Sequence, residues 1–110
     1  MTEKFLKKDD GKPTFDLLPL DLLSDVNLVL HYGAKKYGGP HNWKKAEGFK
    51  FSRAYNALLR HMIAWNFRED NDPETGLSHL AHAMCNLLFL TYHFRYNKTT
   101  ETDDRPKEIK

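Results

Sequence analysis

The segment HLAHAMCNLLFLTYHFRY, residues 79–96, restricts the possible folds of this chain more than any other. From Met84 onward its side chains are apolar on nearly every side of a helix, so the helix has to be covered from several directions. The apolar run is too short to span a bilayer and carries a histidine. We therefore expect a helix that begins after Ser78 as its N-cap and is buried at the centre of a small bundle or between subunits.

Two further segments have helical periodicity. In residues 20–38 apolar side chains recur every three or four positions, and Gly33 indicates either a close helix contact or an early helix end. Residues 52–70 predict a second helix with Ser52 as its N-cap. No segment alternates polar and apolar residues as a half-buried strand would. The sequence therefore predicts an all-α fold of three main helices.

The other segments are connections and termini. Prolines bound residues 13–19, which we expect to form an extended arm packed on the core. Residues 38–50 are rich in helix breakers and predict a long loop. We expect a flexible N-terminus over 1–12, a single domain over 13–97 and a disordered, charged tail over 98–110. Because three helices leave the last one incompletely covered, we expect oligomerisation of identical chains to complete the bundle.

Charge is distributed unevenly along the chain. The net charge of +2 argues against a dedicated nucleic-acid binder. Residues 31–60 contain seven basic residues and one acidic residue, whereas residues 66–75 contain four acidic residues and one basic residue. The first segment suits anionic groups and the second suits cations, although two solvated faces are the commoner reason for such runs.

The cysteine content and the first residues indicate the cellular compartment in which we expect the protein. A single cysteine, Cys85, cannot form an intramolecular disulfide, which fits a reducing cytoplasm. The opening MTEKFLKKDDGK lacks the apolar stretch of a secretion signal. We expect a cytoplasmic protein of a bacterial or phage-infected host cell, without membrane association.

A polar stripe runs along the third predicted helix. His79, His82 and Asn86 share one narrow face because offsets of three and seven residues return to the same side of a helix. A short connector makes the second helix its antiparallel neighbour. Pairing outward from the turn sets Glu69 opposite His79, Trp65 or Asn66 opposite His82, and His61 or Met62 opposite Asn86.

Acidic and imidazole groups gather where these two helices meet the connector. The expected metal ligands are Asp72, His79 and His82, with Glu69 and Asp70 beside them. Carboxylates with neutral imidazoles suit Mn²⁺, Co²⁺, Fe²⁺ or Zn²⁺, whereas oxygen-only sets suit Mg²⁺. Glu69 and His61 are the candidate catalytic residues, His61 as a general base or an orienting group. The alternative is that the histidines only pack and hydrogen bond, while the acids favour the dipole of the following helix.

A basic and aromatic segment, YGAKKYGGPHNWKK, precedes the second helix. Lysine side chains and glycine N–H groups bind phosphates, and aromatic rings stack on bases. The expected phosphate-binding residues are Lys35, Lys36, Lys44 and Arg60. Tyr37 and Trp43 are expected near a base. The alternative is that Trp43 plugs the core beneath the loop and that the lysines are merely solvated.

An ordered set of motifs resembles a phage-associated family named for dATP/dGTP diphosphohydrolase activity. The motifs are KPTFDLLP, YGAKKYG, HNW, LLRHMIAW and DPETGLSHLAHAMCN, over about residues 12–94. The resemblance implies a mostly helical nucleotide hydrolase, loosely akin to the all-α nucleotide pyrophosphohydrolases, which use a divalent metal to cleave a nucleoside triphosphate to the monophosphate and pyrophosphate. The matching positions are Lys35, Tyr37, Asn42, Trp43, Arg60, His61, Trp65, Glu69, Asp72, His79, His82 and Asn86. Among them, Asn42, Trp65 and Asn86 join Tyr37 and Trp43 as expected base or sugar contacts.

Two departures keep the mechanism open. No predicted helix contains the paired acidic motifs ExxE or ExxD of the all-α pyrophosphohydrolases, and the His-Asp dipeptide of another phosphohydrolase class is absent from the sequence. Three hypotheses follow. The first is a hydrolase of purine deoxynucleoside triphosphates that uses Mg²⁺, Mn²⁺ or Co²⁺. The second is a non-catalytic phage protein that sequesters a host signalling nucleotide, and the third is a helical protein-interaction module.

Overall fold

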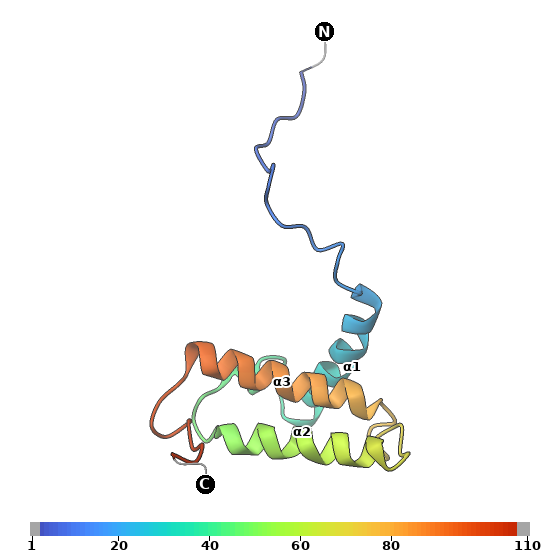
Figure 1. Ribbon diagram of the computed structural model, residues 1–110, viewed down its shortest axis with the longest axis vertical. Coiled ribbons are helices and arrows are strands. Elements are labelled where there is room, and N and C mark those ends of the chain that lie inside the picture. The colour runs from blue at the N-terminus through green and yellow to red at the C-terminus, as the bar shows by residue number, and fades with distance from the viewer. Residues whose placement is uncertain (1–2, 108–110) are drawn as a thin grey trace.

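The computed structural model describes residues 3–107 and is all-α, as predicted (Figure 1). Its elements are α1 (Leu20–Lys36), the short 3₁₀ helix η1 (Asn42–Lys44), α2 (Phe51–Asn66) and α3 (His79–Tyr96). Within residues 3–107 there is no strand, only an isolated bridge between Asn71 and Ser78. No helix of the described chain is long and apolar enough to cross a membrane.

Helices α2 and α3 lie antiparallel and side by side, and α3 also contacts α1 (Figure 1). The third helix begins where the sequence predicts, because the Ser78 side chain accepts a hydrogen bond from the Leu80 N–H at 3.1 Å. Along α1, Gly33 neither ends the helix nor is closely approached by another element, since a Cβ at this position would meet only Tyr37, at 4.0 Å.

Helix α2 ends at Asn66, earlier than the sequence predicts. Arg68 adopts a left-handed φ of 73°. Its N–H donates to the Trp65 carbonyl, and the Glu69 N–H donates to the Ala64 carbonyl, both at 3.0 Å. This is the Schellman arrangement, which satisfies the last carbonyls of a helix while turning the chain away. Glu69 therefore belongs to the connector rather than to the helix.

The core lies between α1 and α3. Val26 and Val29 of α1 pack against Ala81 and Cys85 of α3, with Leu30, Leu77 and Phe89 around them. Burial raises the pKa of the Cys85 thiol to about 12, so this side chain fills space as an uncharged thiol.

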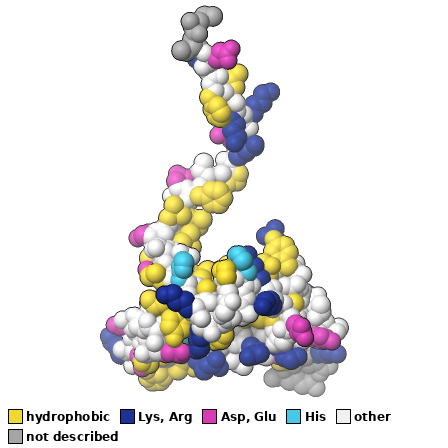
Figure 2. Space-filling model, turned by 180° about the vertical axis from the view of Figure 1, so that it is seen from behind, with side chains coloured by type: hydrophobic (Ala, Val, Ile, Leu, Met, Phe, Trp, Pro, Cys, Tyr) yellow, Lys and Arg dark blue, Asp and Glu magenta, His cyan; other side chains and the backbone are white. Residues whose placement is uncertain are grey.

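The arm before α1 differs from its prediction. Phe15 and Leu17 are 74% and 90% exposed, and the arm projects away from the helices instead of packing on the core (Figures 1 and 2). The reason is that α1 reaches α3 only from Val26 onward, so the arm begins beyond the core. The radius of gyration is 18.4 Å. A compact domain of this length would have about 13 Å.

The long loop is fastened to α3 by aromatic packing and one buried histidine. The Trp43 ring lies 5.3 Å from Phe89 and 5.0 Å from Tyr92, centroid to centroid. His93 is fully buried, its Nε2 donates to the Trp43 carbonyl at 2.7 Å, and its ring stacks on Phe49 at 3.8 Å. Trp43 thus packs beneath the loop, as the structural alternative for this residue predicted.

The start of α2 is capped from elsewhere in the chain, so the predicted N-cap role of Ser52 is wrong. The N-cap position is Lys50, which makes no side-chain cap. The Phe51 N–H donates to the Thr102 carbonyl at 2.8 Å, and the Ser52 N–H donates to Asp104 at 2.9 Å. The segment after α3 therefore folds back onto α2. This differs from the disordered tail expected over 98–110, of which 108–110 lie outside the described residues.

Candidate functional site

The connector between α2 and α3 folds back on itself through backbone hydrogen bonds. The Asp72 N–H donates to the Leu77 carbonyl at 2.8 Å, and the His79 N–H donates to the Asp70 carbonyl at 3.0 Å. Gly76 allows the reversal with a φ of 72°, in the left-handed region that favours glycine. As a result the connector holds its carboxylates over the first turn of α3.

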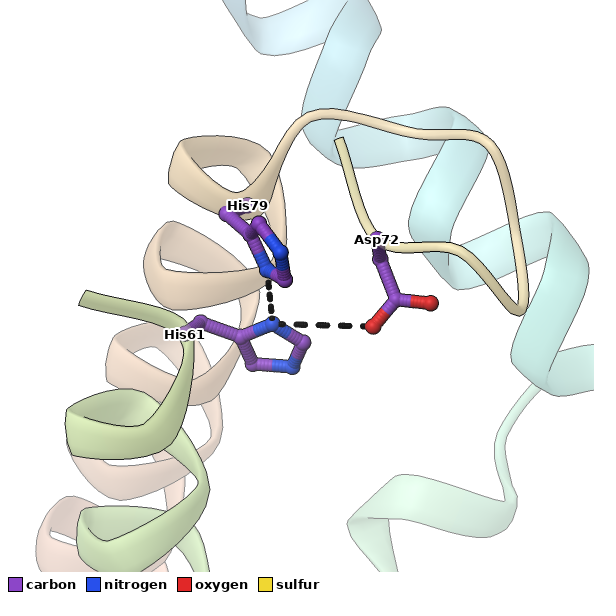
Figure 3. Close-up of side chains that lie close together, drawn as sticks. All are labelled: His61, Asp72 and His79. Carbon is purple, nitrogen blue, oxygen red and sulfur yellow. Dashed lines mark hydrogen bonds and ion pairs between the residues drawn. The ribbon is translucent and has the colours of Figure 1, made fainter. Parts of the chain in front are cut away.

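Asp72 is fixed by this turn with one oxygen free. Its Oδ1 accepts from the backbone N–H groups of Glu74 at 2.8 Å and Thr75 at 3.1 Å, while Oδ2 lies 3.8 Å from Nδ1 of His61 (Figure 3). Burial alone would raise the pKa of this carboxyl, but the two N–H donors and the neighbouring imidazoles outweigh it and lower the pKa. Asp72 therefore presents an ionised oxygen toward His61.

His61 of α2 and His79 of α3 meet through their Nδ1 atoms, 2.8 Å apart (Figure 3). On the far side of the His79 ring, Nε2 lies 2.7 Å from Oε1 of Glu69. An ionised carboxylate only accepts hydrogen bonds, so Nε2 of His79 is a donor, and in the neutral form of this ring Nδ1 is an acceptor. In this state His61 donates from Nδ1 to Nδ1 of His79.

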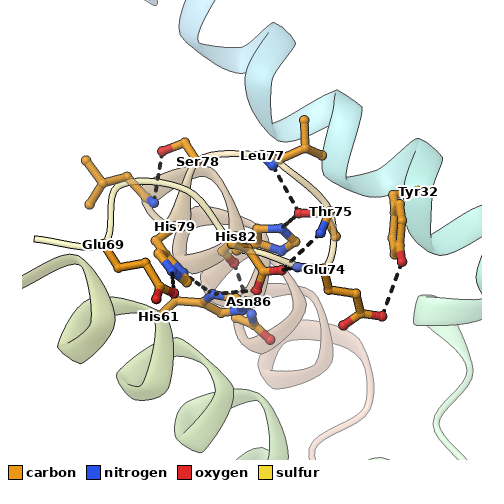
Figure 4. Close-up of polar contacts among 12 residues, drawn as sticks. Tyr32, His61, Glu69, Glu74, Thr75, Leu77, Ser78, His79, His82 and Asn86 are labelled. Carbon is orange, nitrogen blue, oxygen red and sulfur yellow. Dashed lines mark hydrogen bonds and ion pairs between the residues drawn. The ribbon is translucent and has the colours of Figure 1, made fainter.

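His82 lies next to this pair and does not share its contacts. Its ring stacks on the His61 ring at 4.5 Å and 8°, and its Nε2 lies 2.7 Å from the Thr75 hydroxyl (Figure 4). The Asn86 side-chain amide donates to the His82 backbone carbonyl at 3.0 Å, one turn back on the same helix. We call His61, His79 and His82 the histidine cluster.

The predicted pairing between α2 and α3 is confirmed for Glu69 with His79 and is wrong for His61. His61 contacts His79 and His82, a full turn nearer the connector than Asn86. The error has a physical cause: the prediction continued α2 to residue 70, whereas the helix ends at Asn66 and the Schellman turn brings α2 closer to the start of α3.

Two of the cluster's imidazoles are neutral near pH 7. Burial lowers the pKa of His61, and the neighbouring His82 and His79 lower it further. Burial likewise lowers the pKa of His82. The contact between His61 and Asp72 is therefore not an ion pair at neutral pH, and both rings keep lone pairs that can bind a cation.

A single cavity of about 700 Å³ joins the histidine cluster to the basic loop. This volume is typical of small-molecule sites. From the connector side its walls include His61, Asp72 and His82. The predicted phosphate-binding residues on the walls are Lys36 and Arg60. The predicted base or sugar contacts on the walls are Tyr37, Asn42, Trp43 and Asn86.

Other predicted site residues lie elsewhere. Lys35 and Trp65 are exposed and do not line the cavity. The Lys44 ammonium lies 5.4 Å from the Trp43 ring and 5.9 Å from the Tyr92 ring, off the cavity wall. Glu69 and His79 are also off the wall, and they reach the site through the contact of His79 with His61.

The walls also include Glu74 and Thr75, which the sequence did not assign to the site, and the further cations Lys45 and Arg53 of the basic segment and the second helix. Glu74 accepts from Lys36 Nζ at 2.7 Å and from the Tyr32 hydroxyl at 3.2 Å, which ties α1 to the connector. The hydrogen bond from Lys36 lowers the pKa of Glu74. The positive charge of Lys36 is thus already paired. The sequence DPET contains no pattern that indicates the direction of the Glu74 side chain, so its contacts with α1 could not be predicted.

Three side chains from three elements could hold a metal ion together. His61, Asp72 and His79 each bring one ligand atom to within 4.8 Å of the others (Figure 3). Two imidazoles and a carboxylate form a ligand set found at catalytic zinc and non-haem iron sites.

Comparison with known proteins identifies one relative and a family to which this chain is similar. The chain is 36% identical over 100 residues to a protein of Salmonella phage PMBT28 named dATP/dGTP diphosphohydrolase. The match covers 91% of this chain and 32% of that protein, so the chain spans about a third of its relative's length. No solved structure matches. Residues 2–105 match the family described as "dATP/dGTP diphosphohydrolase, N-terminal". The chain therefore belongs to the dATP/dGTP diphosphohydrolase N-terminal family.

Proposed function

We propose that the cavity binds a purine deoxynucleoside triphosphate and that the chain hydrolyses it to the monophosphate and pyrophosphate, with a divalent metal, in the cytoplasm of a phage-infected cell. One observation carries this proposal: a single cavity is lined by His61, His82 and Asp72 together with basic and aromatic side chains. The name of the phage relative supplies the substrate class.

The cavity walls suggest how the substrate lies. Arg60 and Arg53 of α2 line the same cavity as Lys45, so three cations are available to a triphosphate, while Lys36 is already paired with Glu74. Tyr37 and Trp43 offer ring faces near the loop, and the Asn42 amide offers a donor and an acceptor to a base edge. We therefore place the phosphates toward α2 and the base toward η1.

The polar end of the cavity suits hydrolysis. A divalent ion bound there would polarise a phosphoryl oxygen and lower the pKa of a bound water. Asp72 offers an ionised oxygen, and the neutral imidazole of His82 has its Nε2 held by Thr75. His82 can therefore accept a proton from attacking water while keeping a fixed orientation.

The test is a panel of canonical and cyclic nucleotides incubated with the full chain and Mg²⁺, Mn²⁺ or Co²⁺, with products separated by chromatography. We expect dATP and dGTP to yield monophosphate and pyrophosphate. Replacing Arg60 by Ala should raise KM at least 10-fold, as loss of a charged hydrogen bond to phosphate would. Arg95→Ala is the matched control, because Arg95 is an exposed arginine of α3 outside the cavity. Absence of any product with every nucleotide and metal would contradict the hydrolase proposal.

A second candidate is sequestration of a nucleotide without cleavage. It is favoured by the described helices, none of which carries the paired acidic motifs ExxE or ExxD of the all-α pyrophosphohydrolases. A binding protein returns its ligand unchanged after heat release, whereas an enzyme returns products. A protein-interaction module would instead show no rise in melting temperature with any nucleotide, although a ligand at a hundred times its Kd adds about 2.7 kcal/mol.

We also propose that two copies of the chain associate through the outer face of α2 and α3. This face carries partly exposed apolar side chains at helical spacing: Tyr55, Leu59, Ile63, Leu80, Met84, Leu87 and Phe94. It lies away from the cavity, which uses Arg53, Arg60 and His61 of α2.

A further inference from the structure

We infer that His61, Asp72 and His79 form a transition-metal site that binds through Nδ1, Oδ2 and Nδ1, with Glu69 as the positioning residue of His79 (Figures 3 and 4). The inference deepens the proposed function, because it names the ion class and the ligands that the proposed hydrolysis would use. It also changes the expected roles: His61 becomes a ligand instead of a base, and His82 is not a ligand.

The first argument is the convergence of the donor atoms. The Nδ1 atoms of His61 and His79 point at one another at 2.8 Å, and Oδ2 of Asp72 lies 3.8 Å from Nδ1 of His61. In the metal-free chain one proton lies between the two nitrogens. A cation that takes the place of this proton receives both lone pairs once the proton has moved through solvent to Nε2 of His61, since neutral imidazoles are the form that binds metals.

The second argument is that hydrogen bonds outside the site fix two of the three ligands, His79 and Asp72. Glu69 accepts from Nε2 of His79 at 2.7 Å, which fixes the tautomer that leaves Nδ1 free. Metal-binding histidines commonly donate their second nitrogen to a carboxylate in this way. Asp72 has its Oδ1 engaged by two backbone N–H groups, so Oδ2 keeps its direction.

The third argument concerns burial and access. His79 is 3% exposed and comes from the first turn of α3, while His61 and Asp72 line the cavity. The site is therefore closed on the α3 side and open toward the substrate space. Three protein ligands with an open side is the arrangement of a catalytic rather than a structural metal site.

The ligand atoms determine which metal ions the site favours. Two imidazole nitrogens favour Mn²⁺, Co²⁺, Fe²⁺ or Zn²⁺ over Mg²⁺, which prefers oxygen ligands and keeps most of its water. The other polar groups nearby do not offer a comparable set. Nε2 of His82 faces the Thr75 hydroxyl at 2.7 Å, and Glu74 is engaged by Lys36 and Tyr32.

The test is calorimetric titration of the metal-stripped full chain with Co²⁺, Zn²⁺, Mn²⁺ and Mg²⁺, without nucleotide. We expect one site per chain that binds Co²⁺ and Zn²⁺ at least 100-fold more tightly than Mg²⁺, and a visible Co²⁺ spectrum that indicates nitrogen ligands. His61→Ala, His79→Ala and Asp72→Asn should each abolish tight binding while circular dichroism stays helical. Glu69→Gln should weaken binding about 10- to 100-fold and keep the same spectrum, as loss of an outer hydrogen bond does.

Two control variants test whether the loss of metal binding is specific to the three proposed ligands. His41→Ala removes an exposed histidine outside the cluster and should leave affinity unchanged. His82→Phe keeps an aromatic ring over His61 and should retain Co²⁺ binding within a few-fold. Tight binding that survives His61→Ala or His79→Ala, or equal affinity for Mg²⁺ and Co²⁺, would overturn the inference. If these variants lose the metal but no nucleotide is cleaved by the wild-type chain, the metal site stands and the hydrolase proposal fails.

Discussion

His61 and His82 stack between α2, α3 and the connector, and burial lowers the pKa of both. At a pH between the lowered folded value and the ordinary 6.5, the unfolded chain binds more protons than the folded chain. The contribution of neutral imidazoles to stability is therefore complete above about pH 6.5 and is lost as pH falls through the folded-state pKa. Protonation of His61 and His82 at acid pH should therefore lower the free energy of unfolding.

We expect the free energy of unfolding of the metal-stripped chain to be lower at pH 5 than at pH 7.5. Replacing both His61 and His82 by Gln should flatten this dependence, because the titrating groups are gone. Urea unfolding followed by circular dichroism at several pH values measures it. His41→Gln is the control and should leave the slope unchanged. A double variant with the wild-type slope would show that other groups cause the dependence.

At the residue scale the sequence predicted which side chains gather and not how they pair. The stripe of His79 and His82 and the acids of the connector follow from helix periodicity and a short turn. The contact of Glu69 with His79 was found in this way. The direct contact of His61 with His79 could not be predicted, because it depends on where α2 ends. The turn that ends the helix contains Arg68, which adopts a left-handed φ, and arginine is not a residue type that indicates such a turn.

At the scale of elements, the start of α2 depends on a segment far along the chain. Thr102 is buried, its hydroxyl donates to the Asn97 carbonyl at 2.6 Å, and it accepts from the Thr99 N–H at 2.8 Å. Its own carbonyl accepts from the Phe51 N–H at 2.8 Å. One threonine thus orders the turn after α3 and joins it to α2.

Replacing Thr102 by Val keeps the shape and removes the hydroxyl, so the Asn97 carbonyl and the Thr99 N–H lose their partner. We expect a loss of about 1 kcal/mol of unfolding free energy, the usual net contribution of a hydrogen bond, because Asn97 is half-buried and Thr99 is exposed. Denaturant unfolding of Thr102→Val beside Thr100→Val, which alters an exposed threonine, measures it. Equal stability of both variants would mean that the turn contributes nothing.

The sequence predicts the presence of these helices better than it predicts the residues at which they begin and end. The bounds of α3 follow from Ser78 and the apolar periodicity, which are local signals. The cap of α2 could not be predicted, because Asp104 and Thr102 act across more than 50 residues and their composition resembles that of a disordered tail. Long-range hydrogen bonds of this kind leave no local pattern.

At the scale of the whole molecule, the chain exposes more surface than its size requires. Its accessible area is 9569 Å² for a mass of 12.9 kDa. A compact monomer of this mass would expose about 6,300 Å². The projecting arm accounts for part of the excess, and the apolar outer face of α2 and α3 accounts for another part. Because exposed apolar surface is unfavourable in water, this is the face through which we propose that two copies associate.

The partner that we propose for this face is a second copy of the chain. Its seven side chains are between 37% and 55% exposed. At roughly 200 Å² per large side chain they offer roughly 600–700 Å² per copy. A standard stable interface buries about 800 Å² per partner. Two antiparallel helix pairs packed face to face about a two-fold axis give a four-helix bundle, an arrangement that matches each patch with itself. The cavities would remain open on the outside.

We expect light scattering after size exclusion to give a mass of twice 12.9 kDa for the wild-type chain, falling only at high dilution. Leu87→Lys places a charge at the middle of the face and should give a monomer that keeps its helical circular dichroism. Leu17→Lys is the matched control, since it alters a 90% exposed leucine of the arm and should leave the dimer intact. A monomer produced by Leu17→Lys alone would identify the arm as the contact instead, and a wild-type chain that is monomeric at every concentration would contradict self-association through either surface.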